Sequence, residues 1–361
     1  MAHRAAKRPH VSVLLAVRDA DDIVARSIES VINQGFRDFE IIVADCASSD
    51  HTLRTIEHIA EHDIRVEVLK LASDDLGAGL DAALDKARGT YVLVMGQGDW
   101  LAPDYLDRMA DVADRNEAQF AASSLSVDVM HPDGGRSSAL LGPASQTWSS
   151  ADEVHRGLAA LLASDALSSV AGKLFLASRL RSLELRFSKL RDALEFELAY
   201  LDGATRACVE QGPCYHLVAP SISLQLSTAF DSRMFGRCER RHALLMSLYE
   251  KWGLADDPIC MQAVHRLHLQ EVIRCIENAC LSGGNVSSIE RRQRVQDMID
   301  APSTRASIDA LRTSSRDFGL MFGPIARRSA GACFMGARLQ DIISRALAPI
   351  APVRPSLPIY A

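Results

Sequence analysis

The sequence predicts an α/β fold built on a mostly parallel, doubly wound sheet, followed by a C-terminal helical region. Two observations carry this prediction: short apolar runs rich in β-branched residues are typical of buried strands, and apolar residues at helical spacing fill the connections between them. Strands that alternate with helices form parallel sheets. Ligands of such sheets bind beyond the carboxyl ends of the strands.

Four runs are expected to form strands: residues 11–17, 39–44, 64–69 and 90–95. The first connection is a helix with Val24, Ile28 and Val31 on its apolar face. The second begins after Ser48-Ser49-Asp50, whose side chains are good helix caps, and the third spans about residues 77–87.

Six segments along these strands and helices stand out by their order and spacing: Val11–Arg18, Ser30–Gln34, Asp38–Asp45, Ser48–Thr52, Ala87–Tyr91 and Asp99–Tyr105. In their order and spacing they resemble the nucleotide-sugar half of a family 2 glycosyltransferase of the GT-A fold. The resemblance is good over residues 9–130 and weaker over 165–226. It implies a GT-A domain over residues 9–226, with an acceptor half at 131–226, then a helical region at 233–312 and a basic amphipathic tail at 313–361.

The resemblance implies transfer of a sugar from a nucleotide-sugar donor to a cell-surface glycan or a lipid-linked acceptor. Six residues take the donor-contact positions: Ala16, Arg18, Asp45, Cys46, Gln97 and Asp99. Several depart from the family pattern. Ala16–Asp19 replace Pro-Val-Tyr-Asn and lack the aromatic ring that packs on the base, and Asp45-Cys46 replace a pair of aspartates. Cys46 is either a reactive thiol or a small packing residue.

The metal-binding motif is the most altered. Gly96-Gln97-Gly98-Asp99 replace Asp-Ser-Asp-Asp, whose third residue is the usual metal ligand. Mg²⁺ and Mn²⁺ require hard oxygen ligands, so the cation that is usual in the family is doubtful here and no metal ligand is predicted. Asp99 either takes over as a ligand or caps the helix that begins near Pro103.

The acceptor half offers a general base. By the resemblance Glu195 takes the place of the catalytic aspartate, with Asp192 as the competing residue, and a carboxylate there accepts the proton of the acceptor hydroxyl. The other interpretation is that Asp192, Glu195 and Glu197 form the solvent-facing side of a helix whose apolar face is Leu194, Leu198 and Leu201.

Two function hypotheses follow. One is an active transferase with an altered, metal-independent donor site. The other is an inactive pseudo-glycosyltransferase that serves as a binding or scaffold partner. His265 and His268 have ligand-compatible spacing, but without a third ligand in the sequence nearby they are expected to be surface residues.

Composition excludes other classes. The net charge of −6 argues against a nucleic-acid partner, and eight scattered cysteines without a Cys-x-x-Cys pair indicate a reducing cytoplasm. No signal peptide or long apolar run is visible. After Thr313, six arginines face two aspartates among apolar residues. This tail is expected either at an anionic membrane surface, on its inner face, or docked on the protein.

Overall fold

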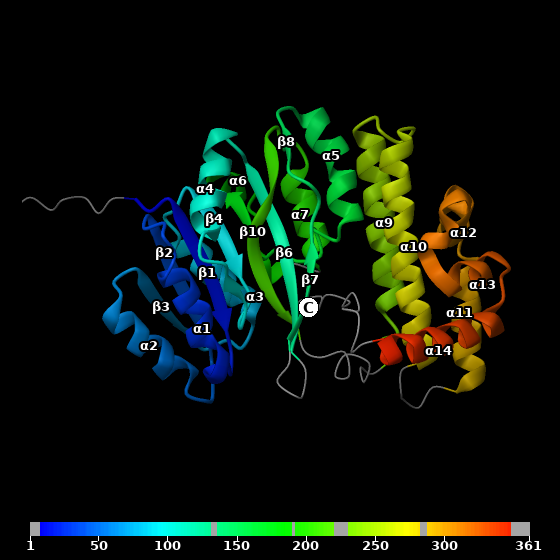
Figure 1. The fold of residues 1–361 in the computed structure, drawn as a ribbon, viewed down its shortest axis with the longest axis horizontal. Helices are drawn as coiled ribbons and strands as arrows, with labels where there is room; N and C mark the ends of the chain where they lie inside the picture. Colours follow the sequence, from blue (N-terminus) through cyan, green and yellow to red (C-terminus); the bar gives the residue numbers. More distant parts are fainter. Residues whose placement is uncertain (1–7, 131–135, 190–191, 220–229, 282–286, 348–361) are drawn as a thin grey trace, which may run out of the picture.

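A ten-stranded sheet covered by helices is followed by an all-helical region in the computed structural model, which describes residues 8–130, 136–189, 192–219, 230–281 and 287–347. The sheet and the helical region lie side by side (Figure 1). The predicted α/β class with a C-terminal helical region is confirmed.

The first half of the sheet is parallel. Its strands are β1 (Val11–Val17), β2 (Phe39–Cys46), β3 (Val66–Leu71) and β4 (Tyr91–Met95), in the order β3-β2-β1-β4. All four predicted strands are present, with ends that differ from the predicted ones by at most two residues. β1, β2 and β4 are buried along their whole length, which is why their sequences are mostly apolar.

The second half of the sheet mixes directions. It continues from β4 through β9 (Lys173–Leu176), β6 (Phe120–Met130), β10 (Ala207–Ala219) and β5 (Trp100–Leu101). β9 is antiparallel to both β4 and β6, whereas β6 and β10 are parallel. Two strands pair outside this path, β7 (Arg136–Leu141) with β6 and β8 (Gln146–Trp148) with β10.

Helices cover both faces of the sheet. One face carries α1 (Asp21–Ile32), α2 (Thr52–His62) and α4 (Tyr105–Arg115). The other carries α3 (Leu76–Lys86), α5 (Ala151–Ala163), α6 (Ala177–Ser182), the short 3-10 helix η1 (Phe187–Lys189) and α7 (Ala193–Leu201). At the start of α2 the Asp50 carboxylate accepts the Thr52 amide at 2.9 Å, as its capping position predicts.

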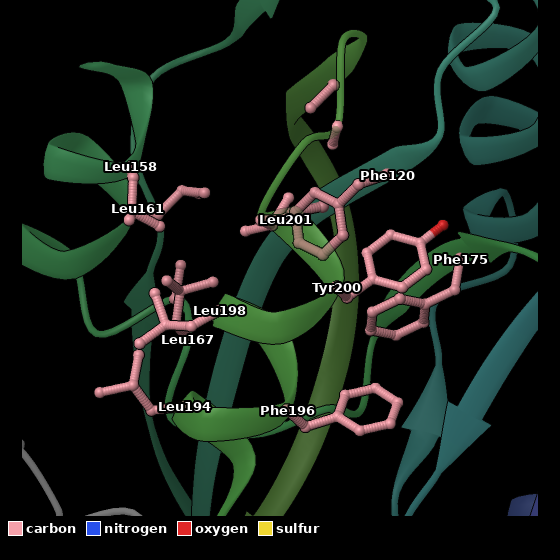
Figure 2. Packing of buried hydrophobic residues seen from close by; sticks show 14 of the residues in the cluster. Phe120, Leu158, Leu161, Leu167, Phe175, Leu194, Phe196, Leu198, Tyr200 and Leu201 are labelled. Atoms are coloured by element: carbon pink, nitrogen blue, oxygen red, sulfur yellow. The ribbon is translucent and has the colours of Figure 1, made fainter. Parts of the chain in front are cut away.

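Helix α7 is packed from two sides. Phe196 lies against the rings of Phe175 and Phe187, at centroid distances of 5.9 and 5.0 Å, while Leu194 and Leu198 face the leucines of α5 (Figure 2). Because α7 is packed against apolar side chains on two sides, little of its surface faces solvent. This packing fixes α7 as a rigid platform next to the sheet.

The C-terminal region consists of helices and one long 3-10 segment: α9 (Met234–Lys251), α10 (Pro258–Leu281), α11 (Ser288–Asp300), α12 (Pro302–Ala310), η2 (Arg312–Met321), α13 (Phe322–Ala326) and α14 (Ala330–Leu347). Apolar residues of α9 and of the start of α10 join the core of the α/β unit through α5. The remaining helices share a second core around the end of α10.

Two expectations for this region are corrected. His268 is not a surface residue, since it is 2% exposed between α9, α10 and α12. In the expected membrane tail, Phe318, Met321 and Phe322 belong to the second core rather than to an exposed face. Residues 348–361 of that tail lie outside the described residues.

Candidate functional site

The carboxyl ends of β1, β2 and β4 meet at one edge of the sheet. Strand register places Val17 opposite Asp45 and Leu15 opposite Met95, so the loops that follow are neighbours. The Arg18 amide donates to Oε1 of Gln97 at 3.0 Å, which joins the loops after β1 and β4. This is the edge at which doubly wound sheets bind ligands.

Asp19 joins the loops after β1 and β2. Its carboxylate accepts the Ser49 amide at 2.7 Å and the Ser49 hydroxyl at 3.0 Å, and these hydrogen bonds lower the pKa of Asp19. The backbone of Asp19 is left-handed, with φ +47°. Beside it the Arg18 guanidinium is 42% exposed and pairs with Asp74 at 2.6 Å. The Arg18 guanidinium therefore places a positive charge at the exposed edge of the site.

Asp45, at the end of β2, has an unsatisfied oxygen. The residue is 3% exposed, and its Oδ2 accepts the Ser48 amide at 3.4 Å. Its Oδ1 is buried and has no hydrogen-bond partner within the described part of the chain. A buried acceptor without a donor costs about 1–3 kcal/mol, and a ligand hydroxyl or N–H group that reached it would remove that cost.

Ala16 and Cys46 lie on the floor of this edge, under α3. A Cβ atom added to Gly79 would be 2.5 Å from the Cys46 sulfur and 3.0 Å from the Ala16 Cβ, so α3 approaches these strands as closely as only glycine allows. Burial, with the nearby Asp45 carboxylate, raises the pKa of the Cys46 thiol to about 11. The thiol is neutral at physiological pH, which favours the interpretation of Cys46 as a packing residue.

The loop after β4 is held by α1. The Gly98 amide donates to the Ser27 hydroxyl at 3.0 Å, and the Gly98 carbonyl accepts Nη2 of Arg26 at 2.5 Å. Gly98 has φ +85°, and an added Cβ would be 3.0 Å from Cδ1 of Ile23. The backbone at this position is thus shaped for glycine rather than for a side chain that bears a ligand.

Asp99 is turned into the protein. It is fully buried, Tyr215 donates its hydroxyl to Oδ2 at 2.5 Å, and the Val218 amide donates to Oδ1 at 2.9 Å. Burial raises the pKa of Asp99 to about 6 despite these hydrogen bonds. The expected capping role is wrong, because α4 begins after Asp104, and Asp99 instead fastens the loop to β10.

The residues of this loop do not fit a divalent cation. Gly96 and Gly98 offer only carbonyl oxygens, and both carboxylate oxygens of Asp99 are engaged by donors on β10. The two groups of described side chains that have metal-ligand geometry lie elsewhere, at His58, Glu61 and His62 and at Cys238, Glu239 and His268. No step of the chemistry is therefore assigned to a cation here.

The two carboxylates expected at the base position have different surroundings. Asp192 is 2% exposed, caps α7 by accepting the Glu195 amide at 3.0 Å, and accepts Nε of Arg241 at 2.6 Å. Both of its oxygens therefore have partners. Glu195 is half-buried in the first turn of α7, and its carboxylate makes no hydrogen bond or ion pair with any described residue.

The expected solvent-facing side of α7 is wrong for two of its three members, since Asp192 and Glu197 are buried. Glu197 is fully buried and pairs with Nζ of Lys173 at 2.7 Å, across from β9. Burial raises the pKa of Glu197 to about 7 and lowers that of Lys173. Leu194, Leu198 and Leu201 are buried as predicted.

Sequence reasoning missed a histidine beside Asp99. The His216 ring stacks on Trp100 with centroids 3.5 Å apart, and its Nδ1 lies 3.1 Å from Oδ2 of Asp128. Hydroxyls of Ser126 and Ser138 bond the other oxygen, so the pKa of Asp128 is lowered even though burial opposes this. Only the pairing of β5, β6 and β10 brings these residues together, and no local motif signals it.

Residues 12–145 match the sequence model of the family described as glycosyl transferase family 2. Over this segment the chain is similar to that family. The match covers the loops after β1, β2 and β4 and ends between β7 and β8.

Curated relatives are similar over the same segment. The chain is 31% identical over 105 residues to the putative glycosyltransferase EpsH of Bacillus subtilis (strain 168), a match that covers 29% of this chain and 30% of that protein. It is 32% identical over 128 residues to the succinoglycan biosynthesis protein ExoO of Rhizobium meliloti (strain 1021), covering 36% of each. The matches thus span about a third of these relatives' length.

Solved structures share the whole fold. The crystal structure of S. aureus TarS residues 1–349 superimposes with a TM-score of 0.54 and 14% identity, covering 92% of this chain and 91% of that one. A longer TarS structure gives a TM-score of 0.52 and 15% identity over 91% of this chain and 55% of that one. At such identities the likeness shows the GT-A fold alone. In the described residues, no helix has the length and apolar character to cross a membrane.

Proposed function

We propose that this chain transfers a sugar from a nucleoside diphosphate sugar to a cell-surface glycan or a lipid-linked acceptor. The match of residues 12–145 to glycosyl transferase family 2 supports a glycosyltransferase, and relatives include a succinoglycan biosynthesis protein and a chondroitin synthase of Escherichia coli. TarS, which shares the fold, has been solved with UDP and with UDP-GlcNAc. The donor is therefore a nucleotide sugar.

The observation that carries this proposal is the unpaired, buried Oδ1 of Asp45 at the carboxyl edge of the sheet. A nucleotide presents the matching groups, since both the ribose hydroxyls and the N–H groups of the base donate hydrogen bonds. Asp45 is proposed to accept one of them. Ala16 and Cys46 form the closed floor beneath the nucleoside.

The diphosphate is proposed to lie across the loops after β1 and β4. Arg18 supplies a guanidinium at the rim, and Gln97 holds the Arg18 backbone in place. Asp99 holds the loop after β4 in place through its hydrogen bonds from Tyr215 and the Val218 amide. Positive charge near the leaving diphosphate stabilises the negative charge that develops there during transfer. Arg18 is thus assigned part of the role that a cation has in related sites.

The acceptor hydroxyl is proposed to lose its proton to Glu195. The acceptor oxygen then forms a bond to the anomeric carbon while the bond from that carbon to the diphosphate oxygen breaks, and the nucleoside diphosphate leaves with the electron pair. Glu195 suits this role better than Asp192 because its carboxylate is not engaged, whereas Asp192 is held by Arg241.

We also propose that the protein works at the inner face of a membrane. On α14, Met335, Leu339, Ile342 and Ile343 are between 41% and 71% exposed and recur at helical spacing. Arg338 is exposed among them. Apolar side chains and arginines on one helix suit an anionic membrane surface, where lipid-linked acceptors reside.

The test is direct binding of UDP, GDP and their sugar conjugates, followed by release of nucleoside diphosphate in the presence of acceptor lipids. Asp45→Asn is expected to weaken donor binding at least about tenfold, or 1.4 kcal/mol. Asp107→Asn, an exposed aspartate on α4, is the matched control. Mn²⁺ is expected to change donor affinity by less than tenfold. If none of the nucleotides binds, the proposal is overturned. If a nucleotide sugar binds but no acceptor lipid leads to release of nucleoside diphosphate, the protein is the inactive alternative.

A further inference from the structure

Three metal-ligating side chains converge between α9 and α10, away from the sheet. Cys238 and Glu239 are consecutive on α9, and His268 faces them from α10. Their ligand atoms, a sulfur, a carboxylate oxygen and an imidazole nitrogen, all lie within 4.8 Å of one another. Cys238 and His268 are each 2% exposed, and Glu239 is partly buried.

Hydrogen bonds from α12 orient two of these side chains. Ser307 lies 2.8 Å from Nδ1 of His268, which leaves Nε2 directed at Glu239, 3.0 Å away. Ser303 donates to both oxygens of Glu239, at 2.8 and 2.7 Å. Metal-binding histidines and carboxylates are usually fixed by such outer hydrogen bonds.

A fourth donor is buried beside them without a partner. His242 is nine-tenths buried, and its Nε2 makes no hydrogen bond in the described structure. Its ring stacks on His268 with centroids 4.0 Å apart. His242 thus presents a buried imidazole nitrogen that has no hydrogen-bond partner among the described residues, on a ring in contact with His268.

We propose that Cys238, Glu239 and His268 bind a zinc ion. A thiolate and a carboxylate together neutralise a divalent cation, so the loaded site carries no net buried charge. Sulfur and nitrogen ligands select zinc over magnesium or calcium, and three side chains with a water molecule in the fourth position complete its tetrahedral geometry. Zinc binding displaces the thiol proton of Cys238 to solvent.

The zinc ion would join α9 to α10 directly and both of them to α12 through Ser303 and Ser307. The expected role is structural, because the ion would hold together helices that meet in the core of the C-terminal region. The inference does not rest on sugar transfer, since none of these residues belongs to the proposed donor or acceptor site.

The test uses Co²⁺, which reports a thiolate ligand by a charge-transfer absorption band, on the full chain freed of metal by a chelator. His58 and His62 are both replaced by glutamine in the background protein, which removes the exposed triad that would also bind metal. One equivalent of Co²⁺ is expected to give the band, and one equivalent of Zn²⁺ is expected to abolish it. Zn²⁺ is also expected to raise the melting temperature.

Cys238→Ala is expected to remove the band, while Cys333→Ala, an equally buried thiol on α14, keeps it. Glu239→Gln, which preserves side-chain size, and Ser307→Ala are expected to weaken Zn²⁺ binding by about 10- to 100-fold or more, so the outcome does not depend on one variant that fails to fold. Absence of the band in the background protein overturns the proposal. A band that survives Cys238→Ala with unchanged affinity also overturns it.

Discussion

Asp99 follows two glycines in a loop where the glycosyl transferase family 2 pattern has four polar or acidic residues, and its surroundings decide what it does. Its two oxygens are bonded to Tyr215 and to the Val218 amide, and solvent does not reach it. A carboxylate in such a place is costly when ionised. This single side chain is therefore expected to make the stability of the protein depend on pH.

Burial raises the pKa of Asp99 from 3.8 to about 6, so the native state binds its proton more tightly than the unfolded chain does. The stabilising contribution is complete below pH 3.8 and is lost as the pH rises through about 6. The loss is about 3 kcal/mol by order of magnitude. Urea unfolding at pH 4–7 is expected to show a shallower fall in Asp99→Asn than in the parent protein. Parallel curves for the two proteins would contradict this, and Asp107→Asn is the control.

Glu195 and Asp192, three residues apart, are expected to respond differently to loss of charge. Glu195→Gln should remove most turnover and leave donor affinity nearly unchanged, because the amide keeps the shape but accepts no proton. Asp192→Asn should lower the free energy of unfolding by about 1–3 kcal/mol, since the buried Arg241 guanidinium loses one of its two carboxylate partners and keeps Glu271. Turnover and urea unfolding of both variants measure this. If Glu195→Gln keeps full activity while Asp192→Asn is stable but inactive, Asp192 rather than Glu195 is the general base.

At the scale of elements, the parallel half of the sheet could be predicted and the second half only weakly. β1, β2 and β4 are mostly apolar because both faces are covered. β9 is equally buried but begins with Lys173, a residue typical of surfaces, whose partner Glu197 lies on α7. The sequence likewise predicts His268 at the surface, because its partners Ser307 and Glu239 lie on α12 and α9. In each case a distant element supplies the partner, and no local pattern encodes it.

The site shows the same division between local and distant information. The positions of Arg18, Asp45 and Gln97 follow from the strands that they succeed, because the carboxyl ends of neighbouring parallel strands share an edge. The bond from Tyr215 to Asp99 and the stacking of His216 on Trp100 depend on β10 pairing with β5, more than a hundred residues away in sequence. Such contacts require the three-dimensional structure.

In the Lys173–Glu197 pair between β9 and α7, each buried charge is expected to be tolerated only while the other is present. Lys173→Met should cost about 3–5 kcal/mol, because it leaves Glu197 buried and unpaired. The double variant Lys173→Met/Glu197→Leu should recover most of that loss, since an apolar pair of similar volume avoids the desolvation of two charges. Chemical unfolding of the single and double variants measures the coupling. Additive losses in the double variant would show that packing, rather than charge, dominates at this position.

At the scale of the whole molecule, charge is divided along the chain. Residues 313–361 carry six arginines and two aspartates, a net charge of +4, and the −6 of the full chain leaves −10 for the remainder. The described part of this segment is fastened to α10 and α11 by its buried residues, so removing it would open the second core. The exposed apolar side chains of α14 are therefore best tested by substitution within the full chain.

The full chain is expected to cosediment with vesicles that contain anionic lipid and to do so less at high salt, because each arginine near the surface contributes about 1 kcal/mol. Replacing Leu339 and Ile342 by glutamine should abolish most of this binding, since their side chains are 48% and 63% exposed and would enter the lipid interface. Ile64→Gln/Ile259→Gln, which removes two isoleucines at least as exposed elsewhere, is the matched control. Equal loss in both double variants would place the membrane contact outside α14, and binding to neutral vesicles alone would exclude the role of the arginines.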